Sequence, residues 1–202
     1  MDGRPVRARP PRTIREPLLG EPSVHELAEC DFIARDVPDF GLSEPEYARA
    51  LDHLVQANVD VIVHTADGRL LLGYRRDLPL RDMFWVFGGR MKPGETLAGT
   101  ASRILARELG LEVEKDRLVL DAVYNVMWSS RSVPPEHHGF QTLLTLMRYE
   151  CAEEEAASVS VADRTHEWIG WYTPDELRGL EAAGSDLLHP FLPVVLRNAG
   201  LL

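Results

Sequence analysis

The centre of the chain has the residue pattern of a β-hairpin. Positions 59–65 are rich in β-branched residues, Asp67-Gly68 is a favoured hairpin turn, and apolar residues return over 69–75. Further short apolar runs follow, each bounded by loop residues. They predict additional strands at 84–87, 118–128, 140–149 and 166–172.

Helical patterns separate these strands. Residues 43–46 have the form of a capping box with proline in the first turn, and they predict a helix to about residue 57. A second helix is predicted over 96–109, which contains no proline and precedes a C-cap glycine, Gly110. Two more helices are predicted from 173 and over 190–198. This order predicts an α/β (α+β) fold, in which a mixed sheet lies between helices as an α/β/α sandwich.

The N-terminus lacks these patterns. Residues 1–20 contain five arginines and four prolines, a composition that cannot pack a core and that predicts a disordered arm. Residues 21–42 show only a weak pattern, and we interpret them as an extension that packs on the domain or on a partner subunit. Residues 43–202 are predicted to form one domain around a single core.

Charge and composition narrow the class of partner. The 202 residues carry a formal net charge of −10, which disfavours nucleic acid and anionic membranes as partners. No apolar run is long enough to span a membrane, and the N-terminus has no apolar signal region. Two cysteines, Cys30 and Cys151, give no disulfide framework. We therefore expect a cytoplasmic protein that binds a small molecule.

One segment carries the candidate chemistry. Residues 88–111 read GGRMKPGETLAGTASRILARELGL, a glycine loop followed by the second predicted helix. Positions 104, 107 and 108 share one helical face, because they are three and four residues apart, and only Glu108 among them is acidic. The pattern predicts one Mg²⁺, or alternatively Mn²⁺, held by Glu108, a carbonyl of Gly88 and substrate phosphate oxygens. Glu95 is a candidate acid behind these ligands.

This segment resembles the Nudix box, the signature of hydrolases that act on a nucleoside diphosphate linked to another group. Ile104 and Arg107 stand where the box has glutamates. The resemblance implies a Nudix fold and Mg²⁺-dependent hydrolysis. Loss of two carboxylates favours departure of the diphosphate from carbon over water attack at phosphorus. The positions that fit the box are Gly89, Glu95, Arg103, Leu105, Glu108, Gly110 and Leu111.

Residues 43–180 are more closely similar to GDP-mannose mannosyl hydrolases. Those enzymes release sugar and nucleoside diphosphate by substitution at the anomeric carbon, so the resemblance implies a nucleoside-diphosphate sugar as substrate. It also implies a homodimer. The matched positions imply catalytic roles for His166, Arg75 and Arg90, substrate contacts for Asp60 and Arg103, and metal ligation by Glu108.

The implied roles follow ordinary chemistry. His166 would accept a proton from the attacking water, as histidine often does near neutral pH. Arg75 and Arg90 would neutralise the charge that grows on the leaving diphosphate. Two departures concern the substrate: Thr142 replaces a functional tyrosine of these relatives, and Thr165 replaces a glutamine that assists the metal. The base and the sugar therefore stay open.

Two other functions also stay open. Water attack at phosphorus would give a nucleoside monophosphate and a sugar phosphate, with Glu136 of a loop in place of a missing box acid. A Nudix-fold binding or regulatory protein without turnover is favoured by Arg107, because a cation on that helical face opposes metal binding.

Three loops complete the interpretation. Residues 77–82 are predicted to line the site. Residues 129–138 are long for a hairpin connection and are predicted to cover the substrate. The acidic run 153–155 is predicted to be a solvated loop.

Overall fold

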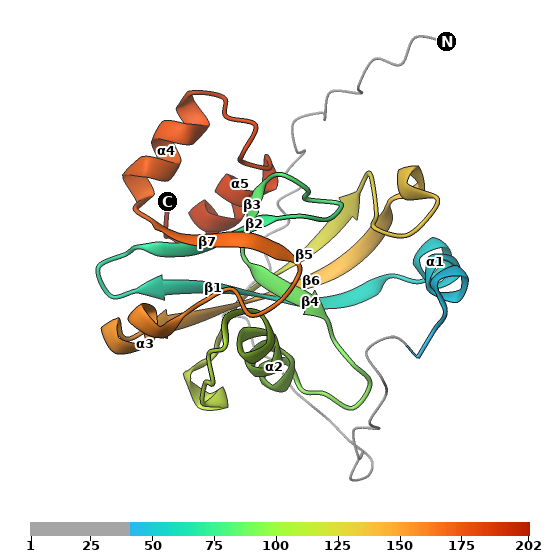
Figure 1. The fold of residues 1–202 in the computed structure, drawn as a ribbon, viewed down its shortest axis with the longest axis horizontal. Helices are drawn as coiled ribbons and strands as arrows, with labels where there is room; N and C mark the ends of the chain where they lie inside the picture. Colours follow the sequence, from blue (N-terminus) through green and yellow to red (C-terminus); the bar gives the residue numbers. More distant parts are fainter. Residues whose placement is uncertain (1–40) are drawn as a thin grey trace, which may run out of the picture.

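Seven strands form one mixed sheet in the computed structural model, which describes residues 41–202 (Figure 1). The strands are β1 (Gln56–Thr65), β2 (Leu70–Arg75), β3 (Phe84–Trp85), β4 (Phe87–Arg90), β5 (Val119–Trp128), β6 (Phe140–Cys151) and β7 (His166–Tyr172). The main path is β3-β2-β1-β6-β5, while β4 pairs with β1 and β7 pairs with β2. β1 and β6 are parallel, and the other paired strands are antiparallel.

Helices cover both faces of the sheet. Helix α2 (Leu97–Leu109) lies on one face, and α4 (Pro174–Ala182) and α5 (Phe191–Asn198) lie on the other (Figure 1). Helix α1 (Glu44–His53) lies beside one end of the sheet, and the short α3 (Glu153–Ser158) follows β6. The predicted α/β (α+β) sandwich with a mixed sheet is therefore confirmed.

The alternation of side chains along β1 creates two cores. Val59, Val61 and Val63 are buried against α2, where Ile104 and Leu105 complete the cluster. Ile62 points to the opposite face, because successive strand residues alternate. That second core includes Leu177 of α4 and Leu192, Val195 and Leu196 of α5.

Helix α2 begins and ends where the sequence predicts. The Thr96 hydroxyl caps the first turn by accepting a hydrogen bond of 3.0 Å from the Gly99 amide. Gly110 ends the helix in the left-handed conformation, with a φ of 65°. These caps set the limits of the helix, while the packing of Ile104 and Leu105 on the sheet sets its rotation and therefore the direction in which Glu108 points.

Some boundaries differ from the prediction, because strand pairing overrides local helix propensity. Helix α1 ends at His53 rather than near residue 57, and β1 begins at Gln56. The extra strand residues pair in parallel with β6 from Gln56↔Thr142 onward. The predicted strand 84–87 is divided between β3 and β4, which pair with different partners.

The acidic run 153–155 is a helix rather than the predicted loop, although Glu153 and Glu154 are exposed to solvent as predicted. These residues begin α3, and the Glu155 carboxylate accepts hydrogen bonds of 2.7 Å from both Arg117 and Tyr149. An acidic first turn suits a helix N-terminus, because it complements the exposed backbone amides there.

The predicted disordered arm at 1–20 and nearly all of the predicted extension at 21–42 lie outside the described residues. Within residues 41–202, no helix combines the length and the apolar character needed to cross a membrane.

Candidate active site

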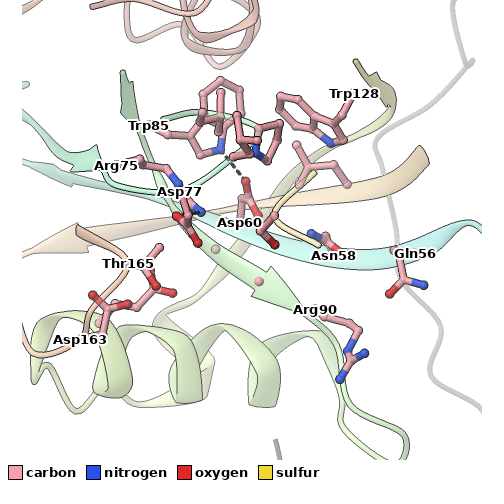
Figure 2. Close-up of a pocket in the computed structure, with 18 of the residues that line it drawn as sticks. Gln56, Asn58, Asp60, Arg75, Asp77, Trp85, Arg90, Trp128, Asp163 and Thr165 are labelled. Atoms are coloured by element: carbon pink, nitrogen blue, oxygen red, sulfur yellow. Dashed lines mark hydrogen bonds and ion pairs between the residues drawn. The ribbon is translucent and has the colours of Figure 1, made fainter. Parts of the chain in front are cut away.

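A pocket of about 610 Å³ opens at the junction of β1, β4, α2 and the segment before β7. Figure 2 shows Asp60 near its middle, Arg75 and Asp163 toward one end, and Trp128 and Gln56 toward the other. Most of the predicted site residues line this pocket: Asp60, Arg75, Gly88, Arg90, Arg103 and Glu108. The fold therefore gathers side chains that lie far apart in the sequence.

Asp60 and Gly88 are cross-strand neighbours in β1 and β4. A Cβ atom at position 88 would overlap the Asp60 carboxylate, so this close approach requires glycine. The Trp85 indole donates a hydrogen bond of 2.8 Å to Asp60 Oδ2 (Figure 2). Burial raises the pKa of Asp60 to about 7, although the Trp85 bond and the Arg75 charge oppose that shift. Asp60 is therefore a buried carboxyl that faces the pocket.

The two arginines of the predicted diphosphate site approach the pocket differently. Arg75 is 13% exposed, and its guanidinium donates to Asp77 at 3.0 Å. Its Nε is buried and has no hydrogen-bond partner among the described residues. The Arg90 guanidinium lies over the Tyr47 ring of α1, 5.1 Å from the ring centre. Both positive charges thus lie along the pocket lining.

Glu108 lies at the end of α2 and is fully buried. Its Oε1 accepts a hydrogen bond from Arg107, and its Oε2 has no partner among the described residues. Burial raises the pKa of Glu108, and the charge of Arg107 opposes this shift. At the other departure from the Nudix box, Ile104 is buried in the core beneath the sheet. Arg107 therefore supplies a countercharge to the single retained acid of this face.

Two residues lie near Glu108: Asp163, which comes shortly before β7, and His166, which is the first residue of β7. Asp163 Oδ1 lies 3.3 Å from His166 Nδ1, and one ligand atom from each of the three residues lies within 4.8 Å of the others. The His166 side chain has no exposed surface, and its ring packs against Gly73 of β2 where a Cβ would overlap it. Burial opposes ionisation of Asp163, but hydrogen bonds from His166 and Thr165 lower its pKa to about 2.

Sequence reasoning missed Asp163. Its only sequence signal is its position three residues before the predicted base, a spacing at which a carboxylate can orient an imidazole. The residue beside the base that the resemblance singles out, Thr165, lines the pocket as well.

The cluster fits a divalent cation. Glu108 Oε2, Asp163 Oδ2 and His166 Nε2 are buried atoms without a hydrogen-bond partner among the described residues. Such atoms are costly in a folded protein unless a ligand satisfies them. Two carboxylate oxygens and one imidazole nitrogen are also typical metal donors.

Glu95 and Arg103 form an ion pair at the opposite end of α2. Arg103 donates to both Glu95 oxygens, at 2.5 and 2.8 Å, and to the Arg90 carbonyl at 3.1 Å. Glu95 also accepts from the Lys92 amide and the Thr100 hydroxyl. Burial opposes ionisation, but these bonds lower the pKa of Glu95 to about 2. The pair fixes the loop between β4 and α2, and Arg103 also lines the pocket.

Thr142 has a structural partner at the far end of the pocket. Its buried hydroxyl accepts a hydrogen bond of 3.1 Å from the Trp128 indole. Trp128 and Phe140, which line the pocket there, are stacked with their ring centres 6.2 Å apart. The aromatic surface in this region therefore comes from Trp128 and Phe140.

The sheet, the glycine strand β4 and the capped helix ending on a buried acid together define the Nudix fold. A NUDIX domain model matches residues 54–193, which is more than half of the chain. The chain belongs to the Nudix hydrolase family.

Solved structures agree with this fold. A MutT NUDIX hydrolase from Burkholderia pseudomallei matches with a TM-score of 0.57 and 19% identity, over 72% of this chain and 98% of that one. The NUDIX domain of Shewanella oneidensis NrtR, solved with ADP ribose, matches with a TM-score of 0.55 and 14% identity, over 79% and 97%.

A longer protein also matches. A bifunctional NMN adenylyltransferase/ADP ribose pyrophosphatase from Francisella tularensis, solved with AMP and manganese, gives a TM-score of 0.55 and 17% identity. The match covers 78% of this chain but 46% of that one, so the present chain spans about half of its length. At these identities the likeness concerns the fold alone.

Proposed function

We propose that the protein is a divalent-metal-dependent hydrolase of a nucleoside-diphosphate sugar, and that it breaks the bond between the diphosphate and the sugar carbon. The observation that carries this proposal is the cluster of Glu108, Asp163 and His166, in which each side chain has one buried polar atom without a hydrogen-bond partner among the described residues. Glu108 and Asp163 line the pocket, and Figure 2 shows Asp163 toward the same end as Arg75.

The metal ligands in this proposal are oxygens. Glu108 Oε2, Asp163 Oδ2 and a carbonyl of Gly88 would hold the ion, a donor set that suits Mg²⁺ and also Mn²⁺. The bound ion would supply charge neutralisation on the diphosphate and so stabilise it as a leaving group.

The protein's own cations would act on the same group. Arg75, Arg90 and Arg107 line the pocket around the glycine strand, where they would bind the diphosphate and stabilise the charge it gains. Positions 104, 107 and 108 share one face of α2, and only Glu108 among them is acidic. With Ile104 in the core and Arg107 as a cation, the site favours departure of a diphosphate over activation of water at phosphorus.

His166 would act as the base. Asp163 holds its Nδ1, which leaves Nε2 to accept a proton from the attacking water. Because the ring is buried, water must reach it from the metal side of the cluster. Asp60 would contact the substrate from the middle of the pocket, and Arg103 from α2.

The other end of the pocket would receive the remaining part of the substrate. Gln56 and Asn58 lie on the same face of β1 as Asp60, opposite the aromatic surface of Trp128 (Figure 2). Amide and aromatic groups bind either a nucleobase or a sugar, so they leave the orientation of the conjugate open.

Two alternatives have specific support. Attack at phosphorus would release a monophosphate, and two structural relatives are named for ADP ribose or its pyrophosphatase activity. Binding without turnover is favoured by Arg107, which already neutralises Glu108.

One experiment separates these functions. The protein is incubated in ¹⁸O-labelled water with Mg²⁺ or Mn²⁺ and a panel of nucleoside-diphosphate sugars that includes GDP-mannose and ADP-ribose. Free sugar carrying ¹⁸O, together with unlabelled nucleoside diphosphate, is the expected result. Label in a phosphate product would establish attack at phosphorus, and tight binding without products would establish a binding protein. Light scattering in the same buffer tests the expected homodimer.

A further inference from the structure

The loop between β5 and β6 forms part of the pocket wall. Trp128 is the last residue of β5, Phe140 is the first residue of β6, and both line the pocket. Ser132, within the loop, lines it too. The position of residues 129–139 therefore determines the shape of the end of the pocket that is farther from Glu108.

This loop is folded around a buried cation. The Arg131 side chain is only 1% exposed, and it ranks among the largest fully buried side chains of the described residues. Its guanidinium donates to the carbonyls of Val133 at 3.1 Å and of Pro134 and Gly139 at 3.5 Å. Its backbone amide donates to the Glu136 carbonyl at 2.9 Å. The loop thus depends on one guanidinium for much of its internal hydrogen bonding.

The countercharge comes from a different element. Asp52 of α1 accepts a hydrogen bond of 2.7 Å from Arg131 Nη1, and its carboxylate also lies 3.2 Å from His138 Nδ1. Asp52 is the only carboxylate that pairs with Arg131 in the part of the chain that the structure describes. A buried guanidinium that loses its countercharge is strongly destabilised, so this contact holds the loop against α1. The same helix carries Tyr47, which lines the pocket and lies under Arg90.

Helix α1 therefore joins two parts of the pocket. Through Tyr47 it contacts the arginine near the glycine strand, and through Asp52 it fixes the wall at the other end. We propose that the Asp52–Arg131 ion pair is a positioning device that holds loop 129–139 in place as a wall of the pocket, and so sets the affinity for the part of the substrate that binds at this end. This inference rests on the proposed function only for the identity of that part.

The test combines two readouts. Asp52→Asn keeps an acceptor but removes the charge, and Arg131→Lys keeps a charge but loses the planar fork. For both, amide hydrogen exchange over 129–139 is expected to rise about tenfold, with no change in α3. KM for the conjugate found in the panel is expected to rise about tenfold, with kcat within about twofold, because the contact lies away from the reacting atoms.

Asp175→Asn is the matched control. Asp175 forms an ion pair of 2.6 Å with Arg178 in α4, and both side chains are exposed, so neither readout should change. Asp52→Glu keeps the charge and is expected to restore most of the affinity. It also serves if the other variants do not fold.

The outcomes are distinguishable from failure of the proposed function. Unchanged exchange over 129–139, or faster exchange with an unchanged KM, would overturn the positioning role. If the unmodified protein turned over no conjugate, the proposed function would be wrong. The positioning role would then be judged by hydrogen exchange and by the Kd of GDP-mannose with Mg²⁺, measured by calorimetry.

Discussion

Glu95, which is partly exposed just before α2, and Glu108, which is buried at its last turn, have opposite surroundings. Near the first turn, Glu95 accepts hydrogen bonds from Arg103 and from two other donors, and both of its oxygens are used. At the last turn, Glu108 has one oxygen without a hydrogen-bond partner within residues 41–202, beside similarly unpartnered atoms of Asp163 and His166. A buried polar group that the protein does not satisfy indicates a binding function, whereas a satisfied one stabilises local structure.

The pKa values of Glu95 and Glu108 differ in the same way as their hydrogen bonding. The hydrogen bonds of Glu95 outweigh its burial and lower its pKa to about 2, whereas burial dominates at Glu108 and raises its pKa. The two residues belong to one sequence motif, yet the fold stabilises the ionised form of only one. A cation bound at Glu108 would reverse this imbalance, which Arg107 offsets only in part.

The largest effect is expected at Glu108. Glu108→Gln keeps the shape and the contact with Arg107 but removes the ligand charge, so metal-dependent turnover should fall about 10³-fold. The melting temperature should stay the same or rise, because a neutral amide avoids the cost of burying a charge. Steady-state kinetics on the conjugate from the panel and thermal unfolding check both statements. Full turnover in this variant would remove Glu108 from the metal site.

At Glu95 we expect the opposite result, a loss of stability with little loss of turnover. Glu95→Gln weakens the pairing of the partly buried Arg103, so the free energy of unfolding should fall by about 2–3 kcal/mol. Turnover by the folded fraction should change less than about tenfold, because the residue acts on the loop and not on the reacting atoms. Urea denaturation measures the first quantity.

The exposed pair of Glu181 and Arg197 is the control for this substitution. Glu181→Gln should change the free energy of unfolding by less than about 1 kcal/mol. A loss of turnover at position 95 as large as that at position 108 would mean that both ends of α2 belong to the catalytic site.

The sequence allowed prediction of positions within α2 better than of contacts between distant segments. Fixed spacing within a single helix predicts that Gly110, Glu108 and Arg103 occupy set positions, because helical geometry alone relates them. Asp163 lies 55 residues after Glu108, and the two are brought together by the pairing of β7 with β2 and by a hydrogen bond of 3.0 Å from the Ala162 amide to the Glu108 carbonyl. Local patterns carry no information on such a contact.

Arg131 shows the same limit. An arginine in a polar loop is ordinarily exposed, and the prediction of a substrate-covering loop at 129–138 contained no role for it. Its burial depends on Asp52, which lies 79 residues earlier in the chain. The strands were predictable to within a few residues because their apolar patterns are local, but their ends depended on pairing partners.

Measurements of metal affinity distinguish the roles of Asp163 and His166 in the cluster. Asp163→Asn removes an oxygen ligand and the orienting partner of His166, so Kd for Mn²⁺ should rise about 10- to 100-fold. His166→Asn should slow turnover and leave that Kd within about threefold, since the proposed ligands are oxygens. Titration of Mn²⁺ followed by electron paramagnetic resonance gives both constants. A large loss of Mn²⁺ affinity in His166→Asn would instead make the imidazole a ligand and assign the base elsewhere.

His189 sharpens the comparison, because it is a partly buried titratable group whose pKa is shifted by burial alone. Its ring packs against Phe191 and Trp128, and its Nδ1 accepts the Phe191 amide at 3.2 Å. Burial lowers its pKa to about 4, below the usual 6.5, so the unfolded chain binds more protons than the folded one between these values. This contribution to stability is complete above pH 6.5 and is lost as the pH falls toward 4.

Between pH 7 and pH 5, the free energy of unfolding of the unmodified protein should fall by about 1 kcal/mol more than that of His189→Asn, since the ring is only partly buried. Urea denaturation at the two pH values measures both losses of unfolding free energy. Equal losses in the unmodified protein and in His189→Asn would show that the ring is protonated in the folded protein without penalty. The cost of an unsatisfied charge would then be confined to the Glu108 cluster.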